Sequence, residues 1–172
     1  MQATEQRKRM VQDTAPCLLS PEQLFDLLAD PTERQTWDLC PPYIVQEPLA
    51  AAPGPALRGA RYTGRGTARG IGYVVLATVT AADRPGRYEV RTESRFERAY
   101  PDAVAVEEYR IEPEGTGSLV HYTVTFVKTS GTGRPLMRLL LALLEPLTAP
   151  RAAKSNFRNM LRYAEKHAGV PA

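Results

Sequence analysis

The spacing of apolar residues changes once the chain has passed Lys128, and this change constrains the fold more than any other feature of the sequence. From Tyr43 to Lys128, apolar and polar residues alternate with a period of two, which is typical of half-buried strands. After Gly133 the period becomes 3.6, with leucines at i, i+3, i+4 and i+7 from Leu136 onward. A long strand-forming stretch followed by one amphipathic helix predicts an α+β protein.

Turn signals divide the alternating stretch into consecutive strands. The segment 82–86 (ADRPG) and the segment 113–117 (PEGTG) both combine proline and glycine with acidic residues, as tight turns do. Strands joined by such short connections pair with their neighbours and form an antiparallel meander. The predicted strands are 43–48, 58–65, 71–80, 87–96, 103–112 and 118–128.

A strand and two short helices are expected before the meander. The strand covers 11–19, and Ser20-Pro21-Glu22-Gln23 then has the residues of a helix start, with serine as the N-cap and proline in the first turn. This helix is expected to end at Asp30-Pro31, and a second covers 32–37. Residues 1–9 are expected to be a flexible tail and 10–169 a single domain.

The C-terminal helix is expected to be some 30 residues long. Its leucine-rich first part ends where Pro146 and Pro150 should kink or break it, and it resumes at Arg151. Seven antiparallel strands curl through their own twist, and one helix cannot fill the concave side of such a sheet. The sequence therefore predicts a hydrophobic cavity between the helix and the sheet.

Several segments resemble the START-like or SRPBCC superfamily. They are 19–31 (LSPEQLFDLLADP) followed by Trp37, 59–65 (GARYTGR), 77–79 (ATV), 109–113 (YRIEP) and the closing segment 156–165. The resemblance covers residues 11–168 and includes no catalytic motif. It implies the helix-grip (Bet v 1/START-like) fold and a deep pocket for a small organic molecule. Bacterial members of this superfamily resemble polyketide cyclases, aromatases and dehydratases, or carriers of lipid-like ligands, and the fold does not decide among these.

Alternation within the strands predicts which side chains face the cavity. On the last strand Tyr122 should face inward and His121 outward, and five tyrosines in all share the inward faces. Aromatic faces suit a flat or polyene ligand and hydroxyl groups suit its oxygens, although the same tyrosines could be ordinary core residues. The expected ligand-binding residues are Trp37, Tyr62, Tyr88, Thr92, Ser94, Tyr109, Val120, Val124, Leu140, Leu144 and Phe157.

Glu107 is the most informative candidate for chemistry because it shares the apolar face of its strand with Tyr109 and Ile111. A carboxyl group in an apolar pocket suits a general acid or base, and tyrosine hydroxyls could assist it. The predicted catalytic residues are therefore Glu107, Tyr122 and Tyr73. Two other interpretations stay open, in which Glu107 pairs with an arginine or meets water at the mouth of the cavity.

No cofactor or metal is expected. Cys17 and Cys40 cannot supply a zinc site or a disulfide framework, and the two histidines are isolated. The N-terminus is polar and no apolar run approaches the ~20 residues of a membrane span, so a cytoplasmic protein without integral membrane association is expected. A monomer or a homodimer is expected.

The segment from Arg134 onward is basic, with seven cations against two acids. A basic helix can bind nucleic acid or a membrane surface, but a solvated outer face is the preferred interpretation, and no nucleic-acid partner is expected. The leading functional hypothesis is a cofactor-independent cyclase, aromatase or dehydratase that folds a polyketide-like substrate in the cavity. The alternative is a non-catalytic carrier or sensor of a lipid-like ligand.

Overall fold

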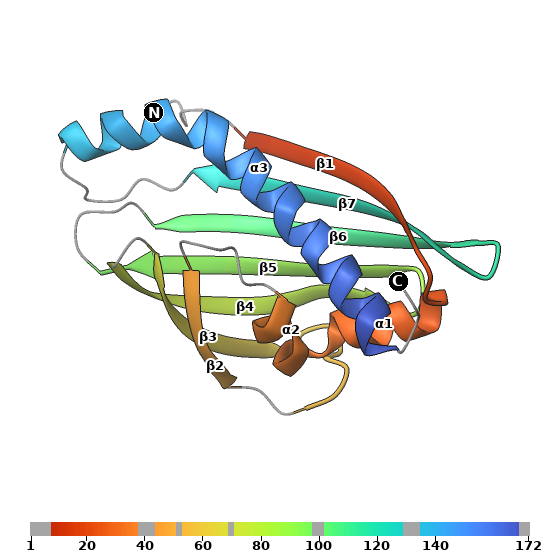
Figure 1. Ribbon diagram of the computed structural model, residues 1–172. Coiled ribbons are helices and arrows are strands. Elements are labelled where there is room, and N and C mark those ends of the chain that lie inside the picture. The colour runs from red at the N-terminus through yellow and green to blue at the C-terminus, as the bar shows by residue number, and fades with distance from the viewer. Residues whose placement is uncertain are drawn as a thin grey trace, which may run out of the picture.

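The computed structural model describes residues 8–37, 44–50, 53–68, 71–97, 102–128 and 135–168. Within these ranges the side chains of residues 8, 9, 44–50, 68, 71, 128 and 135–149 lie outside the description. The elements follow one another in the predicted order (Figure 1). They are β1 (Lys8–Cys17), α1 (Pro21–Ala29), α2 (Pro31–Trp37), β2 (Ile44–Ala50), β3 (Arg61–Ala68), β4 (Ile71–Asp83), β5 (Arg87–Phe96), β6 (Ala103–Glu114), β7 (Gly117–Lys128) and α3 (Pro135–His167).

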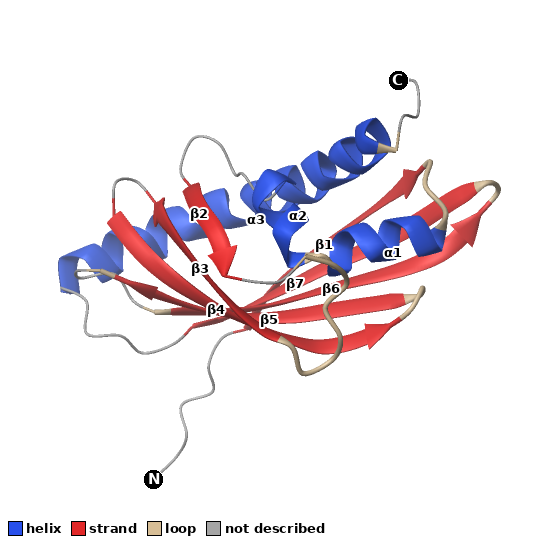
Figure 2. Cartoon of the chain, turned by 90° about the horizontal axis from the view of Figure 1, so that it is seen from below, coloured by secondary structure: helices blue, strands red, loops and turns tan. Residues whose placement is uncertain are grey.

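All seven strands form one antiparallel sheet in the order β1-β7-β6-β5-β4-β3-β2. The strands β2 to β7 make the predicted meander, and β1 pairs with β7 at one edge. Figure 2 shows the sheet curving, with α1, α2 and α3 all on the same face. The prediction of an α+β fold with a curved seven-stranded sheet and a long C-terminal helix is confirmed.

The first helix begins where the sequence predicts. Ser20 and Gln23 form a capping box, in which the Gln23 amide donates to Ser20 Oγ at 3.4 Å and the Ser20 amide donates to Gln23 Oε1 at 3.1 Å. Pro21 occupies the first turn, where its missing N–H costs nothing. The helix then buries Leu24, Phe25 and other apolar residues against the sheet.

Asp30 connects the first two helices and anchors the second. Its Oδ1 accepts hydrogen bonds from the Thr32 amide (2.8 Å) and the Thr32 hydroxyl (2.6 Å), and its Oδ2 accepts one from the Gly54 amide (2.8 Å). Burial acts to raise the pKa of Asp30, but these hydrogen bonds outweigh it and lower the pKa. The start of α2 is thus tied to the loop before β3.

The long helix α3 runs without a break from Pro135 to His167, so of the two outcomes predicted at Pro146 and Pro150, a kink or a break, the break does not occur. A proline removes one backbone hydrogen bond and displaces one carbonyl, and a long helix can absorb both by bending. Figure 1 shows α3 changing direction along its length before it crosses the sheet. Its second half buries Ala153, Phe157, Met160, Leu161 and Ala164.

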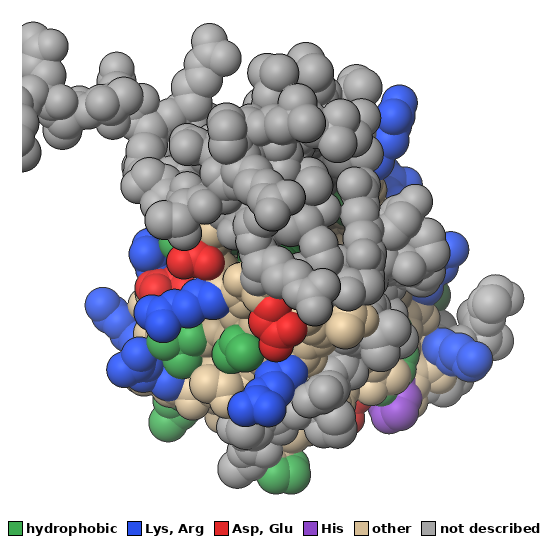
Figure 3. Space-filling view, turned by 90° about the vertical axis from the view of Figure 1, so that its left-hand side faces the viewer, with side chains coloured by type: hydrophobic (Ala, Val, Ile, Leu, Met, Phe, Trp, Pro, Cys, Tyr) green, Lys and Arg blue, Asp and Glu red, His purple; other side chains and the backbone are tan. Residues whose placement is uncertain are grey.

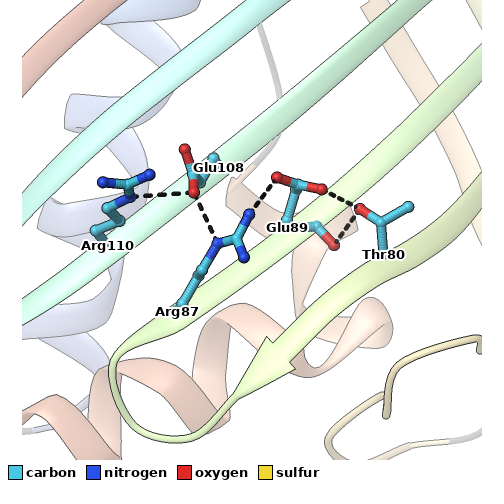
Figure 4. Close-up of polar contacts among 5 residues, drawn as sticks. All are labelled: Thr80, Arg87, Glu89, Glu108 and Arg110. Carbon is cyan, nitrogen blue, oxygen red and sulfur yellow. Dashed lines mark hydrogen bonds and ion pairs between the residues drawn. The ribbon is translucent and has the colours of Figure 1, made fainter.

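The sheet face away from the helices carries a network of ion pairs across β4, β5 and β6 (Figure 4). Arg87 donates to Glu108 Oε1 at 2.7 Å and to Glu89 Oε2 at 2.9 Å, and Arg110 donates to the same Glu108 oxygen at 3.1 Å. Thr80 Oγ1 donates to Glu89 Oε1 at 2.6 Å. The charged side chains of β5 and β6 in this network therefore lie on the outer face of the sheet.

Part of the basic face of α3 is held against the first strand. Arg158 donates to Asp13 Oδ2 at 3.1 Å, and Glu165 Oε1 accepts from the Leu18 amide at 3.0 Å. Figure 3 shows cationic and acidic side chains close together on the described surface of one side of the molecule. These contacts fit the interpretation of a solvated outer face.

Candidate functional site

Five tyrosines predicted to face inward are all buried, each with at most 8% of its surface exposed. They are Tyr62 on β3, Tyr73 on β4, Tyr88 on β5, Tyr109 on β6 and Tyr122 on β7. His121 lies on the other face of β7, where its side chain is 41% exposed, as expected. The alternation of the strands therefore identifies the inner face correctly.

Three of these tyrosines form a continuous row across neighbouring strands. Tyr88 is paired with Tyr109, and Tyr109 with Tyr122, in the strand register. The rings of Tyr109 and Tyr122 lie 5.1 Å apart, and Tyr122 stacks on Phe157 of α3 at 5.0 Å with an interplanar angle of 8°. At the other end of the row, Phe25 of α1 meets Tyr88 edge to face at 6.0 Å. This aromatic row joins the sheet to α1 at one end and to α3 at the other.

Glu107 lies beside this row and is ion-paired with Arg34 of α2. Arg34 Nη2 donates to Glu107 Oε2 at 2.7 Å, and the Tyr109 hydroxyl donates to the same oxygen at 3.2 Å. The Arg34 and Glu107 side chains are only 8% and 16% exposed. Of the interpretations left open by the sequence, pairing with an arginine is the one that the structure shows.

Within the described part of the chain, the second oxygen of Glu107, Oε1, accepts no hydrogen bond. One carboxylate oxygen is therefore held by two donors, while the other has no hydrogen-bond partner among the described residues. This division is useful for proton transfer, because the held oxygen fixes the orientation of the carboxylate.

Arg34 is a site residue that the sequence reasoning missed. It lies three residues after Pro31 and three before Trp37, and all three are buried on one face of α2. Its guanidinium carbon is 5.4 Å from the centre of the Trp37 ring, a cation–π distance. The shared helix face with Trp37 is the signal that could have identified it. We name Arg34, Trp37, Tyr88, Glu107 and Tyr109 the Arg34 cluster.

Two buried polar atoms of the Arg34 cluster have no hydrogen-bond partner among the described residues: the Tyr88 hydroxyl and Trp37 Nε1. Tyr88 is 1% exposed and Trp37 is 3% exposed. Burial raises the pKa of Tyr88 strongly, and the neighbouring Tyr62 phenol raises it further. Arg34 acts on the same hydroxyl in the opposite direction, which places its charge close by.

The structure does not bring Tyr73 together with Glu107. Tyr73 is paired with Phe96 on β5, whereas Glu107 is paired with Val90 on the same strand. Phe96 and Val90 are six residues apart, which is about 20 Å along β5. Its ring contacts Phe96 at 5.3 Å. The predicted grouping of Tyr73 with Glu107 is therefore corrected, because a shared face does not specify position along the strands.

The other predicted ligand-binding residues divide into three groups. Val120, Val124 and Phe157 are almost fully buried in the core. Thr92 and Ser94 are half-buried, and the Thr92 hydroxyl donates to the Ala105 carbonyl at 3.4 Å. The side chains of Leu140 and Leu144 lie outside the described residues, as does Cys40. The predicted cavity between the helix and the sheet stays a prediction.

A second polar contact ties α2 to α3. The Tyr163 hydroxyl donates to Glu33 Oε2 at 2.5 Å, and the Tyr163 ring stacks on His167 at 5.0 Å. Burial, together with the hydrogen bond to Glu33, raises the pKa of Tyr163 to about 12. Since Glu33 precedes Arg34, this contact helps to position the helix that carries the Arg34 cluster.

We expect Tyr163→Phe to weaken the dependence of stability on alkaline pH. A pKa raised from 10.0 to about 12 means that the folded state holds the phenolic proton more tightly than the unfolded state. Its stabilising effect is therefore complete below pH 10 and is lost as the pH rises through 12. Urea unfolding at pH 9 and pH 11.5 should show a larger decrease in the wild type than in the variant. An equal decrease in both proteins would contradict the assignment.

Among the described residues, no group of three or more histidine, cysteine or acidic side chains could hold a metal ion. Over the same residues, no helix combines the length and the hydropathy of a segment that crosses a bilayer.

The curved sheet, the helix lying across it and the inward aromatic row define a protein of the helix-grip class. The chain belongs to the family described as polyketide cyclase / dehydrase and lipid transport, whose model matches residues 10–168. No curated protein sequence matches the chain.

Several solved structures share the fold. Protein CV1439 from Chromobacterium violaceum is 13% identical, with a TM-score of 0.62. The match covers 95% of this chain and 98% of that one. The protein TTHA0849 from Thermus thermophilus is 19% identical, with a TM-score of 0.59 and coverage of 92% and 99%. Ara h 8.0201, a Bet v 1-like protein, is 14% identical, with a TM-score of 0.60 and coverage of 93% and 99%. At these identities the likeness concerns the fold alone.

Proposed function

We propose that the protein binds an apolar small molecule on the inner face of its sheet and acts on it as a cofactor-independent cyclase or dehydratase. The observation that carries this proposal is the state of Glu107, which has one oxygen held by Arg34 and Tyr109 and the other without a hydrogen-bond partner among the described residues. An oriented and largely buried carboxylate suits the removal of a proton next to a carbonyl group. Membership of the cyclase and dehydrase family supports the same reaction class.

In the proposed aldol step, Glu107 Oε1 takes a proton from the carbon beside a substrate carbonyl. The electron pair left on that carbon forms the new carbon–carbon bond to a second carbonyl carbon, and the proton passes to the resulting alkoxide. For dehydration, Glu107 removes a second proton from the same carbon. It passes this proton to the hydroxyl group, which leaves as water while the carbon–carbon double bond forms. Arg34 and Tyr109 are positioning residues here, because they hold Oε2 while Oε1 reacts.

A simple ketone can test the proton-transfer step without knowledge of the natural substrate. The probe is 2-acetonaphthone in D₂O, with deuterium entry into its methyl group followed by NMR. We expect the wild type to accelerate this exchange and Glu107→Gln to lose about 100-fold or more of the acceleration. Glu108→Gln is the matched control, because Glu108 is the next residue on β6 but faces the outer ion-pair network. Equal exchange by wild type and Glu107→Gln would contradict the catalytic role.

A carrier is the second candidate, and a specific observation favours it. The Arg34–Glu107 pair is internally neutral and links α2 to the sheet, as a purely structural ion pair would. The family description also includes lipid transport. A wild type that binds 2-acetonaphthone but leaves its exchange rate unchanged would indicate the carrier.

A further inference from the structure

We infer that the ligand carries an uncharged oxygen acceptor, such as a ketone or ester carbonyl, and that Tyr88 Oη and Trp37 Nε1 recognise it. This inference rests on the proposed binding of an apolar small molecule and specifies its chemistry. It starts from the two buried donors of the Arg34 cluster that lack partners in the described part of the chain.

The two donors come from different elements, and each lies near the same guanidinium group. Trp37 is on α2, where its ring lies 5.4 Å from Arg34 Cζ, and Tyr88 is on β5, close enough for Arg34 to influence its pKa. An indole nitrogen can only donate a hydrogen bond, so Trp37 requires an acceptor. Buried donors without partners are costly, and such groups are usually satisfied by a water or a ligand.

The charge of the Arg34 cluster excludes most other ligand groups. Arg34 and Glu107 neutralise each other at 2.7 Å. An anionic ligand group would compete with Glu107 for Arg34 and leave one negative charge buried without a partner. A cationic group would offer no acceptor to Trp37. A purely hydrocarbon ligand would leave both donors without partners. A neutral oxygen acceptor is the group that satisfies the donors and preserves the ion pair.

Three naphthalene probes of similar size separate these possibilities: 2-acetonaphthone, 2-ethylnaphthalene and 2-naphthoate. Binding to the full chain is measured by calorimetry. We expect the ketone to bind about tenfold more tightly than the hydrocarbon and more tightly than the carboxylate, since one hydrogen bond corresponds to about that factor. The expected order is informative because the hydrocarbon is the more apolar of the two neutral probes.

The single tryptophan offers a direct readout. Its indole N–H should give one cross-peak in a ¹⁵N-correlated spectrum, and this peak should move downfield with the ketone but not with the hydrocarbon. Tyr88→Phe removes only the hydroxyl group, and it should reduce ketone affinity about tenfold while hydrocarbon affinity changes less than twofold. The comparison of probes on the wild type does not depend on whether this variant folds.

The outcomes distinguish this inference from the proposed function. Equal affinity for ketone and hydrocarbon would overturn the inference alone and would indicate that a bound water satisfies the donors. Tighter binding of 2-naphthoate than of the ketone would overturn it in favour of an anionic ligand. Failure of all three probes to bind would overturn both the inference and the binding role. Loss of deuterium exchange with retained ketone preference would remove only the catalytic step.

Discussion

Replacing Arg34 by methionine is expected to lower the free energy of unfolding by about 3 kcal/mol. The substitution leaves the Glu107 carboxylate largely buried, with the Tyr109 hydroxyl as its one remaining hydrogen-bond donor among the described residues. Losing one partner of a buried ion pair typically costs about 3–5 kcal/mol, and the 16% exposure of Glu107 places this case at the lower end. Equilibrium unfolding in urea at neutral pH measures the loss.

A double variant separates the cost of the unpaired charge from the loss of packing. Arg34→Met combined with Glu107→Leu removes both charges, and we expect it to recover most of the lost stability because apolar replacements of buried ion pairs are often neutral. Arg87→Met is the matched control on the outer face, where the arginine is 41% exposed, and it should change stability by less than about 1 kcal/mol. A loss below about 1 kcal/mol for Arg34→Met would contradict the proposed burial of the pair.

Phe157→Ala is expected to lower the free energy of unfolding by about 3–5 kcal/mol. Phe157 is 1% exposed and stacks on Tyr122 at 5.0 Å, so its ring forms an aromatic contact between α3 and β7. Truncation removes buried apolar area and leaves a cavity that the surrounding strands cannot close. Thermal and urea unfolding would both report the change.

Two controls make this second result specific. Phe157→Leu retains most of the apolar volume and should cost clearly less than the alanine variant. Arg158→Ala, at the next position of α3, removes an ion pair in which the arginine is 61% exposed, and Asp13 keeps the hydrogen bond from the Thr14 amide, so this variant should cost clearly less than Phe157→Ala. Equal losses for Phe157→Ala and Arg158→Ala would show that the ring does not carry the contact between α3 and β7.

The periodic features of the chain were predictable because they depend on neighbours in sequence. The alternation on β5 to β7 identifies the inward tyrosines, since side chains of a strand alternate between two faces whatever the strand pairs with. The start of α1 follows from Ser20, Pro21 and Gln23, whose capping contacts all lie within one turn. The long helix was predictable for the same reason, but its continuity through Pro146 and Pro150 was not, because a proline permits either a bend or a break.

The composition of the candidate site depended on contacts between residues far apart in the chain. Arg34 and Glu107 are separated by 73 positions, and no local pattern states that α2 will lie over β6. Tyr73 and Glu107 share a face by alternation, yet the register of β4, β5 and β6 places them about 20 Å apart. The sequence by itself thus determined which side chains face inward, through the fixed geometry of strands and helices. Only the tertiary structure decided which of them meet, because register and helix placement are set by packing of the whole chain.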